Sequence, residues 1–186
     1  MEFNTILDSD LNNDRNLIKA GFGIRLGASL LDGLILIPIT LLNLYALYFE
    51  KSYILYVIAV ALAFLYKPIM EGLFGATLGK MICKIMVVNI DGSRIDNSKA
   101  FVRSILWLFV SITGVFEILP LFENEVYQSL SGFQELSLIQ SEIVEPKMSL
   151  AAQLILLISG LMIALKPKRG IHDYASGTQV VFCKKG

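Results

Sequence analysis

The sequence predicts an all-α membrane protein with four transmembrane helices. Two observations lead to this prediction: the composition of the chain and the lengths of its apolar segments. Hydrophobic residues make up 55% of the 186 residues and charged residues 17%, whereas an ordinary soluble domain carries about 25% charged residues. Four apolar segments each come close to the roughly 20 residues that a helix needs to cross a bilayer. They lie at residues 22–48, 53–70, 101–122 and 148–165.

A membrane explains these segments better than a soluble helical bundle does. Four buried apolar helices in so small a chain would leave too little polar surface for a soluble protein. Residues 1–20 are polar and partly acidic, so they lack the apolar core of a signal peptide. We therefore expect a multi-pass protein of the cell membrane, with a polar cytoplasmic N-terminus at residues 1–20 and a single membrane domain at residues 21–186.

The basic residues predict that both termini are cytoplasmic. Two Lys and Arg residues precede the first apolar segment, five lie between the second segment and the first turn of the third, and five follow the fourth. The opposite side is poor in basic residues, and the loop at residues 123–147 carries most of its charges as glutamate. Because Lys and Arg are enriched in cytoplasmic loops, this loop is predicted to be an outer loop.

The predicted cytoplasmic connection between the second and third helices is more than a plain loop. Its first part, GLFGATLGKMICKIMVV, has apolar residues at helical intervals and lysines on another face, which predicts a short interfacial helix in the headgroup layer. The run KIMVVNIDGSRI is rich in β-branched residues and contains Asp91-Gly92, a hairpin turn signal. GTQVVFC near the C-terminus predicts a further strand. We therefore expect small β-hairpin elements on the cytoplasmic side, or one small sheet that joins the two strands, although so few strands are only marginally stable alone.

Two ionisable residues lie within the first apolar segment. Arg25 and Asp32 are seven residues apart, nearly two helical turns, so both project from one face, about 10 Å apart along the axis. Side chains lean toward the helix N-terminus, which lets Arg25 reach the cytoplasmic headgroups. Asp32 is too short to do so, and a carboxylate near mid-membrane costs roughly 2.5–3.5 kcal/mol. It must therefore be paired, hydrated or protonated.

Three motifs resemble the RDD family of bacterial membrane proteins, named for one arginine and two aspartates. Arg25 and Asp32 match the arginine that opens the family's first helix and the aspartate in the middle of that helix. TLGKMICKIMVVNIDGSRI resembles the family's Thr-x-Gly-Lys segment, followed by a strand, a Gly turn and an arginine at a helix start, here Arg103. GIHDYASGTQVV resembles the closing pattern, which implies that Asp173 is the second aspartate. The family is suspected of transport, and its ligand is generally unknown.

Two classes of function are consistent with these residues. In the first, the protein is a small transporter or cation/proton exchanger in which Asp32 binds a proton or monovalent cation. Glu71 and Lys67 near the inner end of the second helix, and Glu117 near the outer end of the third, are then candidate gate residues. Against this class, the two halves of the chain show no inverted repeat. Four helices also form only a small pore, so a transporter would need to be a homo-oligomer.

In the second class the charges are structural, and the protein is a non-transporting membrane scaffold or assembly partner. Asp32 is then protonated or hydrogen-bonded to Ser29 or to another helix. We expect Arg25 to form a bidentate pair with Asp173, because Arg25 leans toward the cytoplasm and Asp173 follows soon after the fourth helix. In the alternative, Arg25 binds a lipid phosphate while Asp173 caps a short helix.

The residues that usually carry catalysis or bind metals form no recognisable pattern. Cys83 and Cys183 lack the spacing of metal ligands and are expected to be reduced in the cytoplasm. His172 is expected at the surface beside Asp173 rather than in a proton relay. We therefore expect neither enzymatic activity nor a cofactor or metal. The expected partners are the lipid bilayer, a second copy of the chain and an unidentified small ligand or ion; the zero net charge gives no indication of nucleic acid binding.

Overall fold

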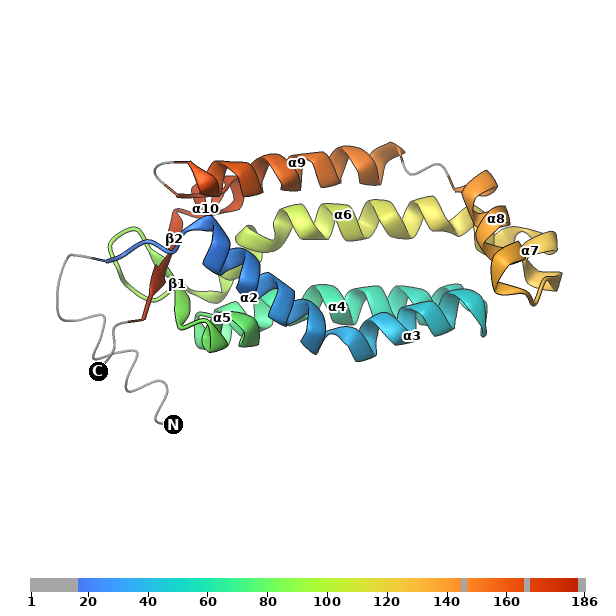
Figure 1. Ribbon diagram of the computed structural model, residues 1–186, viewed down its shortest axis with the longest axis horizontal. Coiled ribbons are helices and arrows are strands. Elements are labelled where there is room, and N and C mark those ends of the chain that lie inside the picture. The colour runs from blue at the N-terminus through green and yellow to red at the C-terminus, as the bar shows by residue number, and fades with distance from the viewer. Residues whose placement is uncertain (1–16, 145–146, 166–167, 184–186) are drawn as a thin grey trace. The chain divides into compact units, whose positions relative to one another are not determined.

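The computed structural model describes residues 17–144, 147–165 and 168–183 and is mostly helical (Figure 1). Two of its helices, α4 (Tyr53–Phe74) and α6 (Asn97–Glu123), are long and apolar enough to cross a membrane. A third such span is formed if α2 (Phe22–Ile35) and α3 (Ile37–Tyr48) are counted together. In α9 (Lys147–Ala164) the apolar part, Leu150–Ala164, is shorter. Most of the predicted polar N-terminus, up to residue 16, lies outside the described residues.

The segment predicted as one helix at residues 22–48 is broken at Leu36. Leu36 has φ −83° and ψ 0°, and Pro38 follows in the first turn of α3. A proline is tolerated there because the N–H that it lacks would have no partner within the helix. In an uninterrupted helix the ring of Pro38 would clash with the carbonyl of Leu34. The break therefore comes one helical turn after Asp32.

The chain forms two compact units, of which the first contains the sheet. This unit consists of the described parts of Met1–Ile35, Tyr66–Ile105 and Leu156–Gly186. Strand β1 (Ile85–Asn89) pairs antiparallel with β2 (Thr178–Phe182), from Ile85 opposite Phe182 to Asn89 opposite Thr178 (Figure 1). Both strands were predicted, and so was the possibility that one small sheet joins them, which is what the structure shows: they pair with each other across about 90 residues, and the local hairpins that were also expected do not form from these two strands. At Asp91-Gly92 the chain does turn, and there Val88 forms an isolated bridge with Arg94.

The sheet is buried on both faces, which explains why β1 reads as a continuous apolar run. Ile85 and Val87 pack on one face with a cluster that includes Val180, and Met86 and Val88 pack on the other with a cluster that includes Val181. A strand exposed on one face would alternate polar and apolar residues, whereas a strand covered on both does not. The N-terminal segment adds to the other edge of β2, where the Ala20 N–H donates to the Val180 carbonyl at 2.9 Å.

Two short helices complete the first unit. α10 (Ile171–Ala175) precedes β2, and α5 (Leu78–Ile82) follows α4 and lies against α2 (Figure 1). The short helix expected between the second and third apolar segments is therefore present. Lys80 was expected on a face of this helix other than the apolar one; the structure shows it buried, with its ammonium paired with Glu71 of α4. The position of α5 relative to a membrane stays a prediction.

The second unit, Leu36–Leu65 with Leu106–Ile155, contains the predicted outer loop. Much of this segment is helical: α7 (Glu125–Ser129) and α8 (Phe133–Ile143) follow α6. Asn124 caps α7, accepting a hydrogen bond from the Tyr127 N–H at 3.0 Å. Apolar side chains from α3, α6, α7 and α8 form one cluster, whose buried members are Leu47, Ile118, Leu121, Phe122, Tyr127 and Leu136.

The exposed surface of α4 is apolar along its whole length. Its exposed large aliphatic side chains recur every three or four residues, which places them on one face of the helix. Such a stripe is unfavourable in water and is typical of a helix that contacts lipid. The members of the stripe are Ile54, Ile58, Leu62, Leu65, Ile69 and Leu73.

Candidate functional site

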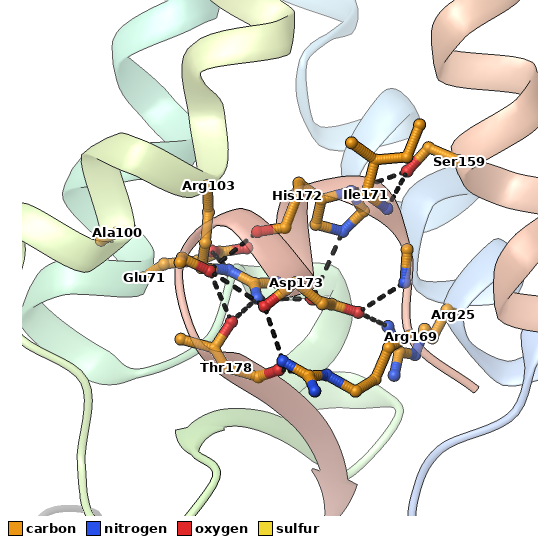
Figure 2. A network of polar contacts seen from close by, with 12 residues as sticks. Arg25, Glu71, Ala100, Arg103, Ser159, Arg169, Ile171, His172, Asp173 and Thr178 are labelled. Carbon is orange, nitrogen blue, oxygen red and sulfur yellow. Dashed lines mark hydrogen bonds and ion pairs between the residues drawn. The ribbon is translucent and has the colours of Figure 1, made fainter. Parts of the chain in front are cut away.

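Asp173 lies at the centre of a buried network of charged side chains in the first unit (Figure 2). Its side chain has no exposed surface. One carboxylate oxygen, Oδ2, accepts from Arg25 Nη1 at 2.7 Å and from the Gly170 N–H at 3.1 Å. The other, Oδ1, accepts from Arg103 Nη1 at 2.5 Å. Asp173 therefore pairs with Arg25 and also caps the first turn of α10, two roles that were expected to be alternatives.

Arg25 and Asp173 were predicted to form a bidentate pair, but a single hydrogen bond joins them. The guanidinium divides its donors among three partners, because Nε donates to the Ala20 carbonyl at 3.1 Å and Nη2 to the Lys168 carbonyl at 2.9 Å. Ala20 precedes α2, and Lys168 lies between α9 and α10. Arg25 thus ties the start of the first helix to the C-terminal segment through one ion pair and two backbone carbonyls.

Arg103 connects Asp173 to a second buried carboxylate. It lies in α6 with its side chain 1% exposed, and its Nε donates to Glu71 Oε2 at 2.9 Å. The Nη1 that contacts Asp173 also donates to the Thr178 hydroxyl of β2. Glu71, fully buried in α4, accepts from the Lys80 ammonium through its other oxygen. An unbroken series of ion pairs therefore joins α2, α10, α6, α4 and α5, in the order Arg25–Asp173–Arg103–Glu71–Lys80.

Sequence reasoning did not select Arg103 and Lys80 as site residues. Both were counted as cytoplasmic charges, and Arg103 was noted only as part of a family motif. A local signal was available for Arg103, since it follows Ala100, Phe101 and Val102 within an apolar helix. An arginine in such surroundings requires a carboxylate partner or a route to water. Its two carboxylate partners are 32 and 70 residues away in the sequence, so the pairing itself had no local signal.

The two arginines keep Asp173 charged at neutral pH. Burial alone would raise the pKa of Asp173, but Arg103 and Arg25 lower it well below its ordinary range. For His172, burial and the neighbouring Arg103 lower the pKa to about 3. His172 is therefore neutral at pH 7, and its 3.5 Å contact with Asp173 is not an ion pair under those conditions. Within the described residues, no buried side-chain nitrogen or oxygen lacks a hydrogen-bond partner.

His172 lies beside Asp173, as predicted, but it is half-buried and not fully at the surface. Its Nδ1 lies 3.1 Å from the hydroxyl of Ser159 in α9, and the same hydroxyl accepts from the Ile171 N–H at 2.9 Å (Figure 2). Neutral His172 with its hydrogen on Nε2 can accept from Ser159 and point that hydrogen toward Asp173. The Ser–His–Asp order resembles a hydrolase triad, but Ser159 is 1% exposed and a histidine with so low a pKa is a weak base at pH 7. The contact holds α10 against α9.

Asp32 has its own set of partners, separate from the network around Asp173. Its Oδ1 accepts from the Tyr66 hydroxyl at 2.7 Å and from the Gly79 N–H at 2.7 Å, and its Oδ2 accepts from the Thr77 hydroxyl at 2.6 Å. Thr77 is the N-cap residue of α5, yet its hydroxyl does not cap that helix. Asp32 therefore takes the place of the usual capping side chain, bonding an N–H of α5 from a neighbouring helix.

The Thr-x-Gly-Lys segment has a structural role at each named position. Thr77 donates to Asp32, and Lys80 binds Glu71. Gly79 lies so close to α2 that a Cβ there would be 2.1 Å from the Ala28 carbonyl oxygen and 2.9 Å from the Asp32 nitrogen. Only a glycine fits such a close approach of two backbones. The segment therefore joins α2 to α4 through backbone contact on one side and an ion pair on the other.

The predicted gate residues are divided between the two units. Glu71 lies in the network of the first unit, and Lys67 is half-buried one helical turn before it on α4. Glu117 belongs to the second unit, where its carboxylate accepts from the Met148 N–H at the start of α9 at 2.6 Å. In the described part of the chain, no three His, Cys, Asp or Glu side chains are grouped to hold a metal ion.

The fold and the site define a small helical membrane protein in which buried ion pairs join several helices to one another beside a two-stranded sheet. The family model described as the RDD family matches residues 19–177. The chain therefore belongs to the RDD family. No curated protein and no solved structure matches it.

Proposed function

We propose that this protein is a non-transporting scaffold or assembly protein of the cell membrane, in which Arg25, Asp32 and Asp173 have structural roles. The observation that carries the proposal is the set of donors on Asp32. Both oxygens of this carboxylate already accept hydrogen bonds from Tyr66, Thr77 and Gly79. A cation would need oxygen ligands at this point, but all three groups act as donors to Asp32 in this structure, and the Gly79 N–H cannot act as a ligand. Their arrangement supports a carboxylate that holds α5 on α2.

The buried ion pairs support the same proposal. Three cations and two anions are shared among five elements, and each charge contacts at least one of the opposite sign. Removing a single partner from a buried pair leaves an uncompensated charge, which is strongly unfavourable. Such a network favours one fixed arrangement of these elements over two exchanging ones. Alternating access in a transporter depends on two such arrangements.

The proposed topology has four transmembrane helices with both termini in the cytoplasm. The distribution of Lys and Arg supports this orientation. α9 is the shortest of the four: its 18 residues would extend about 27 Å, against roughly 30 Å for a hydrocarbon core, and its apolar part, Leu150–Ala164, is shorter still. Such a helix would cross with little tilt.

Cysteine labelling tests this topology. In a variant without Cys83 and Cys183, we expect Ser131→Cys to react with an impermeant thiol reagent added to intact cells, and Ser98→Cys to react only after the membrane is opened. Both serines are exposed, so a difference in labelling reports the side of the membrane and not burial. Labelling of Ser98→Cys in intact cells would contradict the orientation.

Transport is the second candidate function, and the break in the first helix favours it. The interruption at Leu36 comes one turn after Asp32, and transporters often bind their ions where a membrane helix is discontinuous. In this reading Asp32 binds a proton or a monovalent cation in place of its present hydrogen bonds. Tyr66 and Thr77 would remain as hydroxyl ligands, because a hydroxyl can also accept.

A flux assay in proteoliposomes separates the two functions. Na⁺, K⁺ and pH gradients are applied to the wild-type protein and to Asp32→Asn. We expect no protein-dependent flux in either, and a small loss of thermal stability in the variant. Asparagine retains a carbonyl acceptor, and its amide can donate to Thr77, whose hydroxyl can reverse its role. A wild-type flux that Asp32→Asn abolishes, while the variant still folds, would establish transport instead.

A further inference from the structure

The helices α7 and α8 form a cap over one end of the second unit, and this cap is anchored to the end of α3. Tyr127 of α7 has no exposed surface, and its hydroxyl donates to the Leu47 carbonyl. The Tyr48 hydroxyl donates to Gln140 of α8 at 2.8 Å, and its ring lies 4.8 Å from that of Phe133. These contacts fix the cap from two sides. They leave the carbonyl groups at the end of α7 to a different partner.

That partner is the ammonium group of Lys51, in the turn between α3 and α4. Its Nζ donates to the carbonyl oxygens of Tyr127 at 2.9 Å and Gln128 at 3.0 Å, and also to that of Leu130. The last carbonyls of a helix have no partner within the helix. An ammonium group has three hydrogens, so three converging carbonyls satisfy it completely. The same ammonium lies 5.4 Å from the centre of the Tyr127 ring, within range of a cation–π contact.

The backbone of Lys51 adds a second observation. Its φ is 49°, a left-handed conformation that is uncommon for a residue with a side chain. Such conformations persist only where the surrounding contacts hold them in place. Here the turn places the Lys51 side chain where its ammonium reaches three carbonyls of a segment more than 75 residues away.

We propose that the carbonyls of Tyr127, Gln128 and Leu130 form a binding site for a primary ammonium ion, which Lys51 supplies from within the chain. The bound ammonium holds the end of α7 on the α3–α4 turn. The ligand must carry both a positive charge and several N–H donors grouped on one atom. A planar guanidinium spreads its donors over a fork and fits three oxygens around one point less well.

Chemical rescue tests this site. We expect Lys51→Ala to increase amide hydrogen exchange in Glu125–Ser129 about tenfold to a hundredfold, the effect of losing charge-assisted hydrogen bonds. Propylammonium replaces the missing part of the side chain and should restore protection, whereas tetramethylammonium has the charge but no N–H and should not. Lys84→Ala is the matched control, because Lys84 also has a positive φ of 53° but lies in the first unit.

Lys51→Gln serves as the second variant, since its neutral amide can still donate to two carbonyls and preserve the fold. We expect its exchange rates in α7 to lie between those of the wild type and Lys51→Ala. The proposal would be overturned by wild-type protection in Lys51→Ala, by wild-type protection in Lys51→Gln, or by equal rescue with the two ammonium ions. A failure of both ions to restore protection would also overturn it.

Discussion

Replacing Arg103 by methionine is expected to lower the free energy of unfolding by about 3–5 kcal/mol, the usual cost of removing one partner from a buried ion pair. Arg103 has the largest share of the network, because it contacts Glu71, Asp173 and Thr178 with almost no exposed surface. Methionine has a similar length but no donors, so both carboxylates lose a buried partner. Thermal or denaturant unfolding of the purified protein in detergent measures the loss.

Arg94→Met is the matched control for this measurement. Arg94 is a half-buried arginine of the same unit whose Nη2 donates to the Leu73 carbonyl, and it has no ion pair in the network. We expect it to cost about 0.5–1.5 kcal/mol, as for an ordinary hydrogen bond. Equal losses in the two variants would mean that the buried ion pairs contribute little. Exchanging the charges of Arg25 and Asp173 is a poorer test, because an arginine at position 173 would face Arg103.

Substituting Gly79 by alanine is expected to destabilise the protein by about 3 kcal/mol, at the upper end for an overpacked contact. The new Cβ would meet the backbone of α2, which cannot move aside as the end of a flexible side chain could. Relief would require α5 to move from α2 and thereby weaken the hydrogen bonds of Gly79 and Thr77 to Asp32. The same unfolding experiment measures this effect.

Gly27→Ala is the control with the opposite expected sign. A Cβ at Gly27 meets nothing within 4 Å in the described chain, and Gly27 lies inside α2. Alanine is favoured over glycine within a helix by about 0.5–1 kcal/mol, so this variant should be as stable as the wild type or slightly more so. If both variants lose the same stability, close packing of α5 on α2 does not explain the glycine at position 79.

Local patterns in the sequence predicted the elements better than they predicted their partners. The apolar run of β1 and the GTQVVFC segment were both expected to be strands, because β-branched residues between turn signals favour that structure. The turn signal at Asp91-Gly92 left local hairpins and a sheet that joins the two strands both open, and the structure shows β1 paired with β2. In this pairing both faces of the sheet are buried by apolar side chains.

In the candidate site, too, the sequence predicted some residues but not all of their partners. The position of Arg25 in its helix and its direction predicted a partner near the C-terminus, and the pair with Asp173 is present. The partners of Asp32 were not predicted, because two of them, Thr77 and Gly79, lie in a segment expected to rest among lipid headgroups. Periodicity identifies an amphipathic face, but it does not distinguish contact with headgroups from contact with another helix.

The sequence by itself determined the class of the protein and its family. An excess of apolar residues in helix-length segments cannot be buried in a soluble fold of this size, and the three motifs around Arg25, Thr77 and Asp173 depend only on residue type and spacing. Only the tertiary structure decided which charges meet. The contacts of Arg103 with Glu71 and Asp173, of Asp32 with α5, and of Arg25 with Asp173 all join residues that are far apart in the sequence. The separations range from 32 to 148 residues. Such pairs form because packing removes several charges from water together, and each must then find its partner among the groups buried beside it.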